Sequence, residues 1–206
     1  MPLYLGRHGQ NLDNYHGILN GHRDLPLTPL GVQQAHQLAQ VIKSEGLIFD
    51  AVFTSPLLRA VNTAQIICEH LELPLPIILP DLIERNFGVM TGKPACDIER
   101  LCTPHVIKTE TITYFTNADG SETFPQLFAR AKLVLCNFEI EPRFHDASVL
   151  FLGHGDFGKM LYAAFYGLSW EEVLASFHFG NGELLKLERG LDPRDAHFIK
   201  QAQHNH

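Results

Sequence analysis

The stretch Pro2-Leu3-Tyr4-Leu5-Gly6-Arg7-His8-Gly9 opens the chain and decides how its fold is interpreted. Residues 2–5 are apolar and predict a short buried strand that ends where the charged residues begin. In α/β proteins, ligands bind at the C-terminal ends of the parallel strands. An arginine beside a histidine suits an anionic ligand, because the guanidinium holds the anion and the imidazole can attack it. The tripeptide alone is a weak signal, and a simple polar strand end explains it equally well.

Composition and charge are those of an ordinary globular protein. The 206 residues are 45% hydrophobic and 19% charged, which predicts one domain over residues 1–206 with a substantial core. The net charge of −7 and the lack of a long basic run disfavour nucleic acid as a partner. No apolar stretch approaches the roughly 18 residues of a membrane span, so no membrane partner is expected. Met1 leads directly into the first strand without a signal peptide, which predicts a cytoplasmic location.

The four cysteines show neither zinc nor redox spacing, since no Cys-x-x-Cys pair occurs. They are expected to be reduced, partly buried thiols: Cys68, Cys96, Cys102 and Cys136.

Strand-like and helix-like segments alternate along the chain. Helices are expected at residues 28–46, 55–70, 123–138, from about 156 and at 170–177, and strands at 49–54, 76–79, 147–152 and 183–187. Thr28-Pro29 and Ser55-Pro56 each place a capping side chain before a proline, a preferred helix start. The alternation predicts an α/β fold with a mostly parallel central sheet flanked by helices. Residues 92–120 are less regular and predict a small inserted lid.

Polar residues follow three of the predicted strands. The first strand leads to Arg7 and His8, the second to Arg59 in the first turn of a helix, and the strand at 147–152 to His154. Because the carboxyl ends of parallel strands face one crevice, these four side chains are expected to converge. The arginine fork matches phosphate geometry, and the helix N-termini after Ser55 and near residue 156 add aligned N–H groups.

The ordered set of motifs resembles the histidine phosphatase superfamily, which has the phosphoglycerate mutase-like fold. The matching segments span most of the chain: Arg7-His8-Gly9 with Asn14, residues 21–28, Ser55-Pro56 with Arg59-Ala60, residues 82–88, Glu122-Thr123 with Arg130, and Gly153-His154-Gly155. The resemblance implies a three-layer sandwich with a small inserted lid. The chain departs from the family pattern at Gln10, Asn11 and Asp156. Asp156 stands where a small residue is common and is expected to cap the following helix.

The resemblance also implies a mechanism. His8 would attack phosphorus and form a phosphohistidine, with its other ring nitrogen held by a backbone carbonyl. Glu84 would protonate the leaving oxygen and then activate water. The oxygens of the phosphoryl group would be held by Arg7, Asn14, Gly21, Arg59, His154 and Gly155. No metal or other cofactor is expected, because the cationic side chains stabilise the charge.

Three functions are compatible with these residues: a phosphomonoester phosphatase, a cofactor-dependent phosphoglycerate mutase, and a catalytically silent phosphate-binding protein. A mutase must also hold a carboxylate, yet residues 101–129 contain no arginine and one lysine, Lys108. Phe87 replaces the tyrosine usual in the mutase branch, although Lys93 could compensate in part. These differences favour a phosphatase acting on a small phosphorylated metabolite. The oligomeric state and the substrate stay open, with four lid residues as candidate lining: His105, Lys108, Tyr114 and Phe115.

Overall fold

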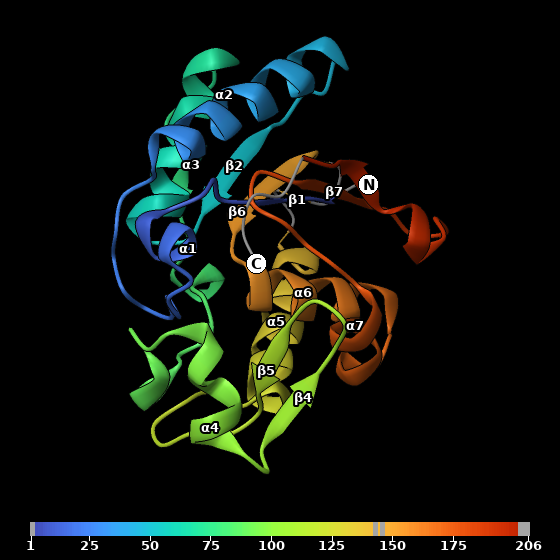
Figure 1. Ribbon diagram of the computed structural model, residues 1–206. Coiled ribbons are helices and arrows are strands. Elements are labelled where there is room, and N and C mark those ends of the chain that lie inside the picture. Colours follow the sequence, from blue (N-terminus) through green and yellow to red (C-terminus); the bar gives the residue numbers. More distant parts are fainter. Residues whose placement is uncertain (1–2, 142–143, 145–146, 202–206) are drawn as a thin grey trace.

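A six-stranded sheet runs through the centre of the computed structural model, which describes residues 3–141, 144 and 147–201 (Figure 1). The strand order is β3-β2-β6-β1-β7-β8. The bounds are β1 Leu3–Arg7, β2 Ala51–Thr54, β3 Ile77–Ile78, β6 Val149–Gly153, β7 Leu184–Leu187 and β8 His197–Ile199. The first four strands of this order are parallel, and β7 is antiparallel to both of its neighbours, β1 and β8. The predicted α/β fold with a mostly parallel sheet is therefore confirmed, while β8 was not predicted and Pro2 lies outside the described residues.

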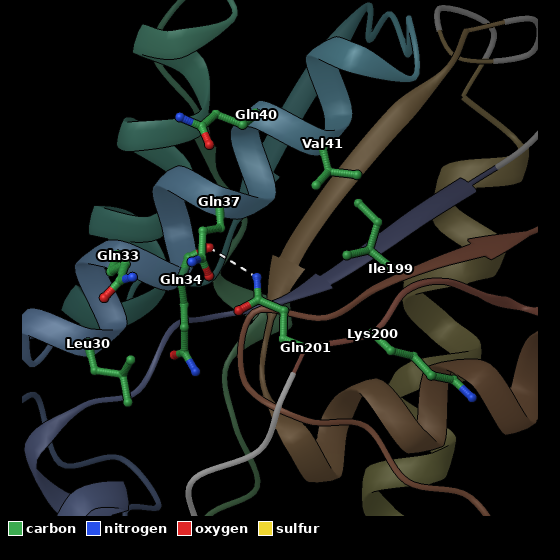
Figure 2. Close-up of a pocket in the computed structure, with 9 residues that line it drawn as sticks. All are labelled: Leu30, Gln33, Gln34, Gln37, Gln40, Val41, Ile199, Lys200 and Gln201. Atoms are coloured by element: carbon green, nitrogen blue, oxygen red, sulfur yellow. Dashed lines mark hydrogen bonds between the residues drawn. The ribbon is translucent and has the colours of Figure 1, made fainter.

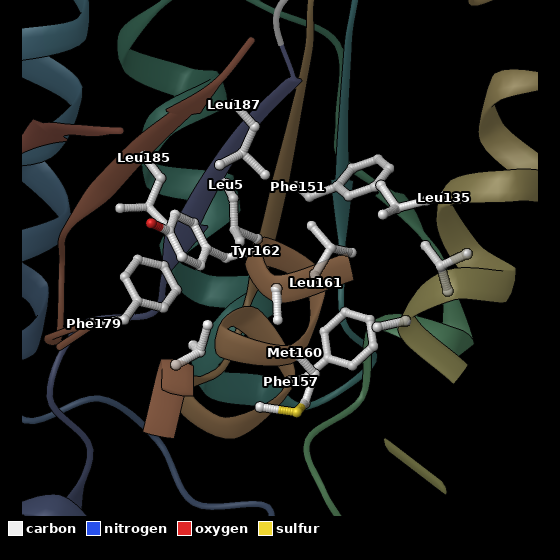
Figure 3. Packing of buried hydrophobic residues seen from close by; sticks show 14 of the residues in the cluster. Leu5, Leu135, Phe151, Phe157, Met160, Leu161, Tyr162, Phe179, Leu185 and Leu187 are labelled. Atoms are coloured by element: carbon white, nitrogen blue, oxygen red, sulfur yellow. The ribbon is translucent and has the colours of Figure 1, made fainter. Parts of the chain in front are cut away.

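Helices cover both faces of the sheet and make three layers. On one face lie α2 Pro29–Ser44 and α3 Leu58–His70, and on the other α5 Phe124–Glu139, α6 Gly155–Tyr166 and α7 Trp170–Ser176 (Figure 1). Strand residues alternate between the two cores, as the pleat requires. Leu150 and Leu152 pack towards α2 and α3, whereas Phe151 packs towards α5 and α6. Figure 3 shows the second core, where Leu5, Phe151 and Leu185 of the sheet meet Phe157, Met160 and Leu161 of α6.

Side chains cap the starts of α2, as predicted at Thr28, and of α5, where no cap was predicted. Thr28 accepts a hydrogen bond from Gly31 N at 3.0 Å before Pro29 opens α2. Thr123 and Gln126 form a reciprocal capping box at the start of α5. The start of α2 also contacts the loop after β1, since a Cβ at Gly9 would lie 2.2 Å from the Gly31 carbonyl oxygen. Only glycine allows this approach, which holds α2 against the loop that carries His8.

The segment predicted as a lid, about residues 92–120, holds more regular structure than the sequence predicts. Its flanks are joined where Glu122 N donates to Asn86 O at 2.8 Å, and we refer to residues 87–121 as the lid. It contains the unpredicted antiparallel hairpin of β4 Val106–Lys108 and β5 Thr113–Phe115, beside α4 Ile98–Cys102. A small core of its own holds it together: Phe87, Met90, Ile98, Cys102 and Phe115. In Figure 1 the lid lies below the sheet, on the side of α1 Leu12–His16.

Short 3₁₀ turns complete the described elements: η1 Pro80–Leu82, η2 Gly88–Met90, η3 Ala95–Asp97 and η5 Pro193–Asp195. Within the described residues, every helix is too short or too polar to cross a membrane.

Candidate active site

Three parallel strands end side by side. Arg7 is opposite Gly153 in the register of β1 and β6, and Thr54 of β2 is opposite Leu152. The backbone ladder continues one step further, because His8 N donates to Gly153 O at 3.1 Å. This places His8 beside His154, with ring centroids 5.1 Å apart. The convergence predicted from strand ends is thus present in the structure.

His8 is buried and fixed by hydrogen bonds at both ring nitrogens. Its Nδ1 lies 2.7 Å from the Gly9 carbonyl oxygen, which can only accept, so Nδ1 carries the proton. Nε2 accepts a hydrogen bond from Arg59 Nε at 3.1 Å. Burial, followed by the charges of Arg59 and Arg7, holds the pKa of His8 well below its usual value. The imidazole is therefore neutral and presents a lone pair on Nε2, which is the form that can act as a nucleophile.

Arg59 extends from the first turn of α3 into the same cluster and is 1% exposed. Its Nη1 donates to Arg23 O at 2.7 Å and its Nη2 to Gly21 O at 3.0 Å. Gly21, expected at the phosphate site, thus contacts Arg59 through its carbonyl oxygen. Burial lowers the pKa of Arg59 to about 10, so the guanidinium stays charged at neutral pH.

The predicted cap of α3 by Ser55 is wrong. The helix begins at Leu58, and Asp24, distant in sequence, accepts from Leu58 N at 2.6 Å. Ser55 Oγ lies instead 2.7 Å from His154 Nε2. When the Ser55 hydroxyl donates to Nε2, the proton of neutral His154 resides on Nδ1. Ser55 is therefore an orienting partner of His154, a role that the sequence did not reveal.

Two buried polar side-chain atoms have no hydrogen-bond partner within the described part of the chain: Arg7 Nε and His154 Nδ1. Both belong to this cluster. The other end of the Arg7 guanidinium is anchored, since Nη1 donates to Phe179 O at 2.5 Å. An unsatisfied buried donor costs about 1–3 kcal/mol, and a ligand that accepts from both would recover this energy. The arrangement is that of a pocket for an anion beside His8 Nε2.

Glu84 reaches the cluster from the loop after β3 and is 7% exposed. Its Oε1 accepts from Arg85 N at 2.9 Å and Phe157 N at 3.0 Å, and its Oε2 from Asp156 N at 3.3 Å. The N-terminal amides of α6 were expected to bind the phosphate, but the structure shows two of them holding Glu84. The carboxylate is thereby fixed in orientation at the edge of the pocket.

The expected cap of α6 by Asp156 is also wrong. The N-cap position is His154, without a side-chain capping bond, and Asp156 lies in the first turn. Its carboxylate accepts from Arg85 Nε at 2.9 Å instead. Asp156 therefore serves as the counter-ion of a buried arginine.

Asn14 and Gly155 border the pocket. Asn14 Oδ1 accepts from Asn181 Nδ2 at 3.3 Å, and the same amide group donates to His8 O at 2.9 Å. A Cβ at Gly155 would lie 3.2 Å from Arg7 Cζ, so the glycine packs against the guanidinium. Asn11, which departs from the family pattern, caps α1 by accepting from Asn14 N at 3.0 Å.

The four candidate lining residues of the lid have different surroundings. Phe115 lies in the lid core, and His105 is exposed. Lys108 is exposed and paired with Glu99 at 2.6 Å. Tyr114 is buried and accepts a hydrogen bond from Lys159 Nζ at 2.5 Å. Lys159, a 3% exposed lysine of α6, was not singled out from the sequence. Its spacing of four residues from Gly155 on one helix face was the available signal.

A groove of about 450 Å³ lies elsewhere, between α2 and the end of β8 (Figure 2). Its described lining is mainly glutamine, and Gln201 Nε2 donates to Gln34 O at 3.2 Å. Glutamine amides neither attack phosphorus nor neutralise a phosphate, so the site is placed at the strand ends and not in this groove.

Known proteins resemble this chain in sequence and in architecture. Residues 3–199 match the profile of the histidine phosphatase superfamily (branch 1). A 2,3-bisphosphoglycerate-dependent phosphoglycerate mutase of Methylobacterium sp. (strain 4-46) is 32% identical over 174 residues, 83% of this chain and 83% of the mutase. The adenosylcobalamin/alpha-ribazole phosphatase of Escherichia coli (strain K12) is 31% identical over 189 residues, 87% of this chain and 84% of the phosphatase. Mycobacterial glucosyl-3-phosphoglycerate phosphatase, solved in complex with VO3, superposes with a TM-score of 0.75 at 26% identity, covering 91% of this chain and 92% of that one.

Replacing Arg59 tests the anion pocket. Arg59→Lys keeps the charge but removes the fork that contacts His8 and the 21–23 loop. A hydrogen bond to a charged group is worth about 1.5–3 kcal/mol, so we expect orthovanadate to bind about 10- to 100-fold more weakly. Inhibition constants or calorimetric titration give the measurement. Arg100→Lys is the matched control, because Arg100 is exposed and paired with Asp97. Unchanged vanadate affinity in Arg59→Lys would remove Arg59 from the pocket.

Proposed function

We propose that this chain, which belongs to the histidine phosphatase superfamily, hydrolyses phosphate monoesters of small metabolites through a phosphohistidine on His8. The observation that carries the proposal is the neutral, buried imidazole of His8 beside two buried nitrogens that have no hydrogen-bond partner within the described residues, Arg7 Nε and His154 Nδ1. A nucleophilic nitrogen next to donors that lack an acceptor suits a phosphoryl group.

In the first step, His8 Nε2 attacks phosphorus in line with the ester oxygen. The N–P bond forms as the P–O bond to the leaving group breaks, and protonated Glu84 gives its proton to the leaving oxygen. In the second step, ionised Glu84 takes a proton from water, whose oxygen attacks phosphorus. The N–P bond breaks, phosphate leaves, and His8 and Glu84 return to their starting forms.

The surrounding donors stabilise the charge that spreads over the phosphoryl oxygens. Arg7 Nε and His154 Nδ1 can donate without breaking any existing hydrogen bond. Arg59 Nε donates to His8 Nε2 in the absence of ligand. Once that nitrogen bonds to phosphorus, it no longer accepts, so Arg59 Nε is released towards a phosphoryl oxygen. Attack by His8 therefore frees the Arg59 donor at the moment when charge builds up on the phosphoryl oxygen.

Hydrolysis is favoured over a mutase reaction by the charges of the lid. A mutase that depends on 2,3-bisphosphoglycerate must hold two phosphates and a carboxylate. Arg85 is 1% exposed and tied to Asp156, so it cannot swing into the site. Arg100 and Lys108 are exposed and paired with Asp97 and Glu99. Some mutases are about 30% identical to this chain, so the mutase reaction is the alternative to be tested.

The cysteines support a proposal for the cellular setting. All four are free thiols: Cys68, Cys96, Cys102 and Cys136. Free thiols support a reducing compartment, and we place the enzyme in the cytoplasm.

His8→Ala tests the nucleophile. We expect turnover of p-nitrophenyl phosphate to be abolished, because the variant lacks the nitrogen that forms the intermediate. Wild-type protein mixed briefly with substrate and quenched in alkali should carry one acid-labile phosphate on His8, located by peptide mass spectrometry. His16→Ala is the control, since His16 lies in the last turn of α1 away from the ring contacts of His8. A phosphate found on another residue would refute the assignment.

Glu84→Gln tests the general acid. General acid catalysis contributes about 10²- to 10⁴-fold, and the benefit shrinks when the leaving group needs no proton. We expect hydrolysis of an alkyl phosphate to fall by this factor, and the presteady-state burst from p-nitrophenyl phosphate to fall much less. Stopped-flow burst rates with both esters give the comparison. Equal losses for the two would mean that Glu84 only positions the substrate.

The reaction outcome separates phosphatase from mutase. With 3-phosphoglycerate and a trace of 2,3-bisphosphoglycerate, we expect free phosphate to appear and little 2-phosphoglycerate, because two of the three lid cations, Arg100 and Lys108, are paired with acids and the third, Lys93, is exposed. Phosphate release and isomer exchange are followed in the same sample. Isomer exchange that outruns phosphate release would establish the mutase instead.

A further inference from the structure

One buried cation has no part in the proposed reaction. Lys159 of α6 is 3% exposed, and its one hydrogen-bond partner within the described residues is Tyr114 Oη, at 2.5 Å. An ammonium group has three donors, so two remain without a protein acceptor. A buried charge is normally paired with an opposite charge, because desolvation without a partner is costly. The vacant donors of Lys159 therefore point to an anionic ligand.

Helix geometry indicates that the side chain of Lys159 lies on the face of α6 that borders the phosphate pocket. Residues four apart lie on the same face of a helix, and Lys159 follows Gly155, whose Cβ position faces Arg7. Side chains on a helix also tilt towards its N-terminus, which for α6 is the end at His154. Lys159 interacts electrostatically with Arg7, Glu84 and Asp156, consistent with this direction.

The nearby acids already have partners of their own. Asp156 is paired with Arg85, and Glu84 accepts three backbone N–H groups. Glu183 accepts from Gly180 N and lies 3.5 Å from His197. Burial lowers the pKa of Lys159 to about 8, which still leaves the ammonium mostly charged at pH 7.

Tyr114 connects Lys159 to a groove of about 650 Å³. The groove lies between the β4–β5 hairpin and the end of α7, and Ile112, Tyr114, Phe177 and His178 are among its lining residues. In Figure 1 the turn of the hairpin lies beside α7. His178 immediately precedes Phe179, whose carbonyl oxygen anchors Arg7. His178 also interacts electrostatically with Lys159 and Arg7, so the groove and the phosphate pocket are joined through residues 178–179.

We propose that Lys159 and Tyr114 bind a carboxylate on the leaving group, so that the enzyme acts on phosphate esters of hydroxy acids whose remaining part lies in the groove. The proposal rests on the proposed function. Tyr114 Oη accepts from Lys159, which leaves its own proton free to donate. Two ammonium protons and one hydroxyl proton match the two oxygens of a carboxylate, and one positive charge matches its single negative charge.

The test compares two esters that differ at the carboxylate: 3-phosphoglycerate and glycerol 3-phosphate. Lys159→Met keeps the length of the side chain and removes the charge. We expect kcat/KM for phosphate release from 3-phosphoglycerate to fall about 10- to 100-fold, and that for glycerol 3-phosphate to change less than about threefold. Tyr114→Phe should lower kcat/KM for 3-phosphoglycerate relative to glycerol 3-phosphate by a smaller factor. Lys159→Arg should retain most of the wild-type preference for 3-phosphoglycerate.

Lys132→Met is the matched control, because Lys132 lies on the exposed side of α5 over the Phe128 ring. Thermal unfolding of each variant checks that the fold is retained. Equal losses with both esters would show that Lys159 only supports the lid, and this would overturn the proposal. Unchanged kcat/KM values with both esters would overturn the proposal as well.

Binding measurements keep the inference separate from the reaction. In the His8→Ala background, calorimetry should give tighter binding of 3-phosphoglycerate than of glycerol 3-phosphate, and Lys159→Met should abolish the difference. If wild-type protein released no phosphate from any ester while this binding difference persisted, the hydrolase proposal would fail and the carboxylate site would stand. Hydrolysis of both esters without a binding difference would overturn the carboxylate site alone.

Discussion

The hydrogen bond from Arg59 to the neutral imidazole of His8 is the contact on which the rest of the site depends. It places a buried guanidinium beside a ring that must stay unprotonated at Nε2. Such a cluster of desolvated positive charge is unfavourable without compensation. The protein compensates with backbone carbonyls of Gly9, Gly21 and Phe179, which accept from His8, Arg59 and Arg7 without adding negative charge. The pocket therefore keeps its positive charge for an incoming anion.

Much of the fold and of the candidate site was predictable from the sequence, because both follow from local rules. Short apolar runs predicted the strands, and parallel strands of one sheet place Arg7, His8 and His154 at one edge whatever the details of packing. The caps of α2 and α5 depend on residues three apart and were equally accessible. The family resemblance then added Glu84, whose position depends on a loop that no periodicity describes.

What was missed depends on contacts between distant segments. Ser55 and Asp156 each precede or begin a helix, and either can cap it by local rules. In the fold, Ser55 contacts His154, 99 positions away, and Asp156 contacts Arg85, 71 positions away. These contacts replace the local caps. The β4–β5 hairpin was missed for a related reason. Its two strands have three residues each and are stabilised by the lid core rather than by a strong turn signal.

Helix α6 unites the separate parts of the chemistry. Its first amides orient Glu84, its first turn supplies the counter-ion of Arg85, and its second turn carries Lys159. Arg85 in turn is covered by Phe87, Phe115 and Phe124, with ring centroids 4.8, 4.1 and 4.3 Å from its Cζ, and donates to Phe115 O. The lid is therefore joined to α6 by two buried cations, Arg85 and Lys159. One helix therefore holds Glu84, the counter-ion of Arg85 and Lys159, and a shift of α6 would move all three together. Under the proposed function, the choice of substrate depends on this helix as much as on the lid.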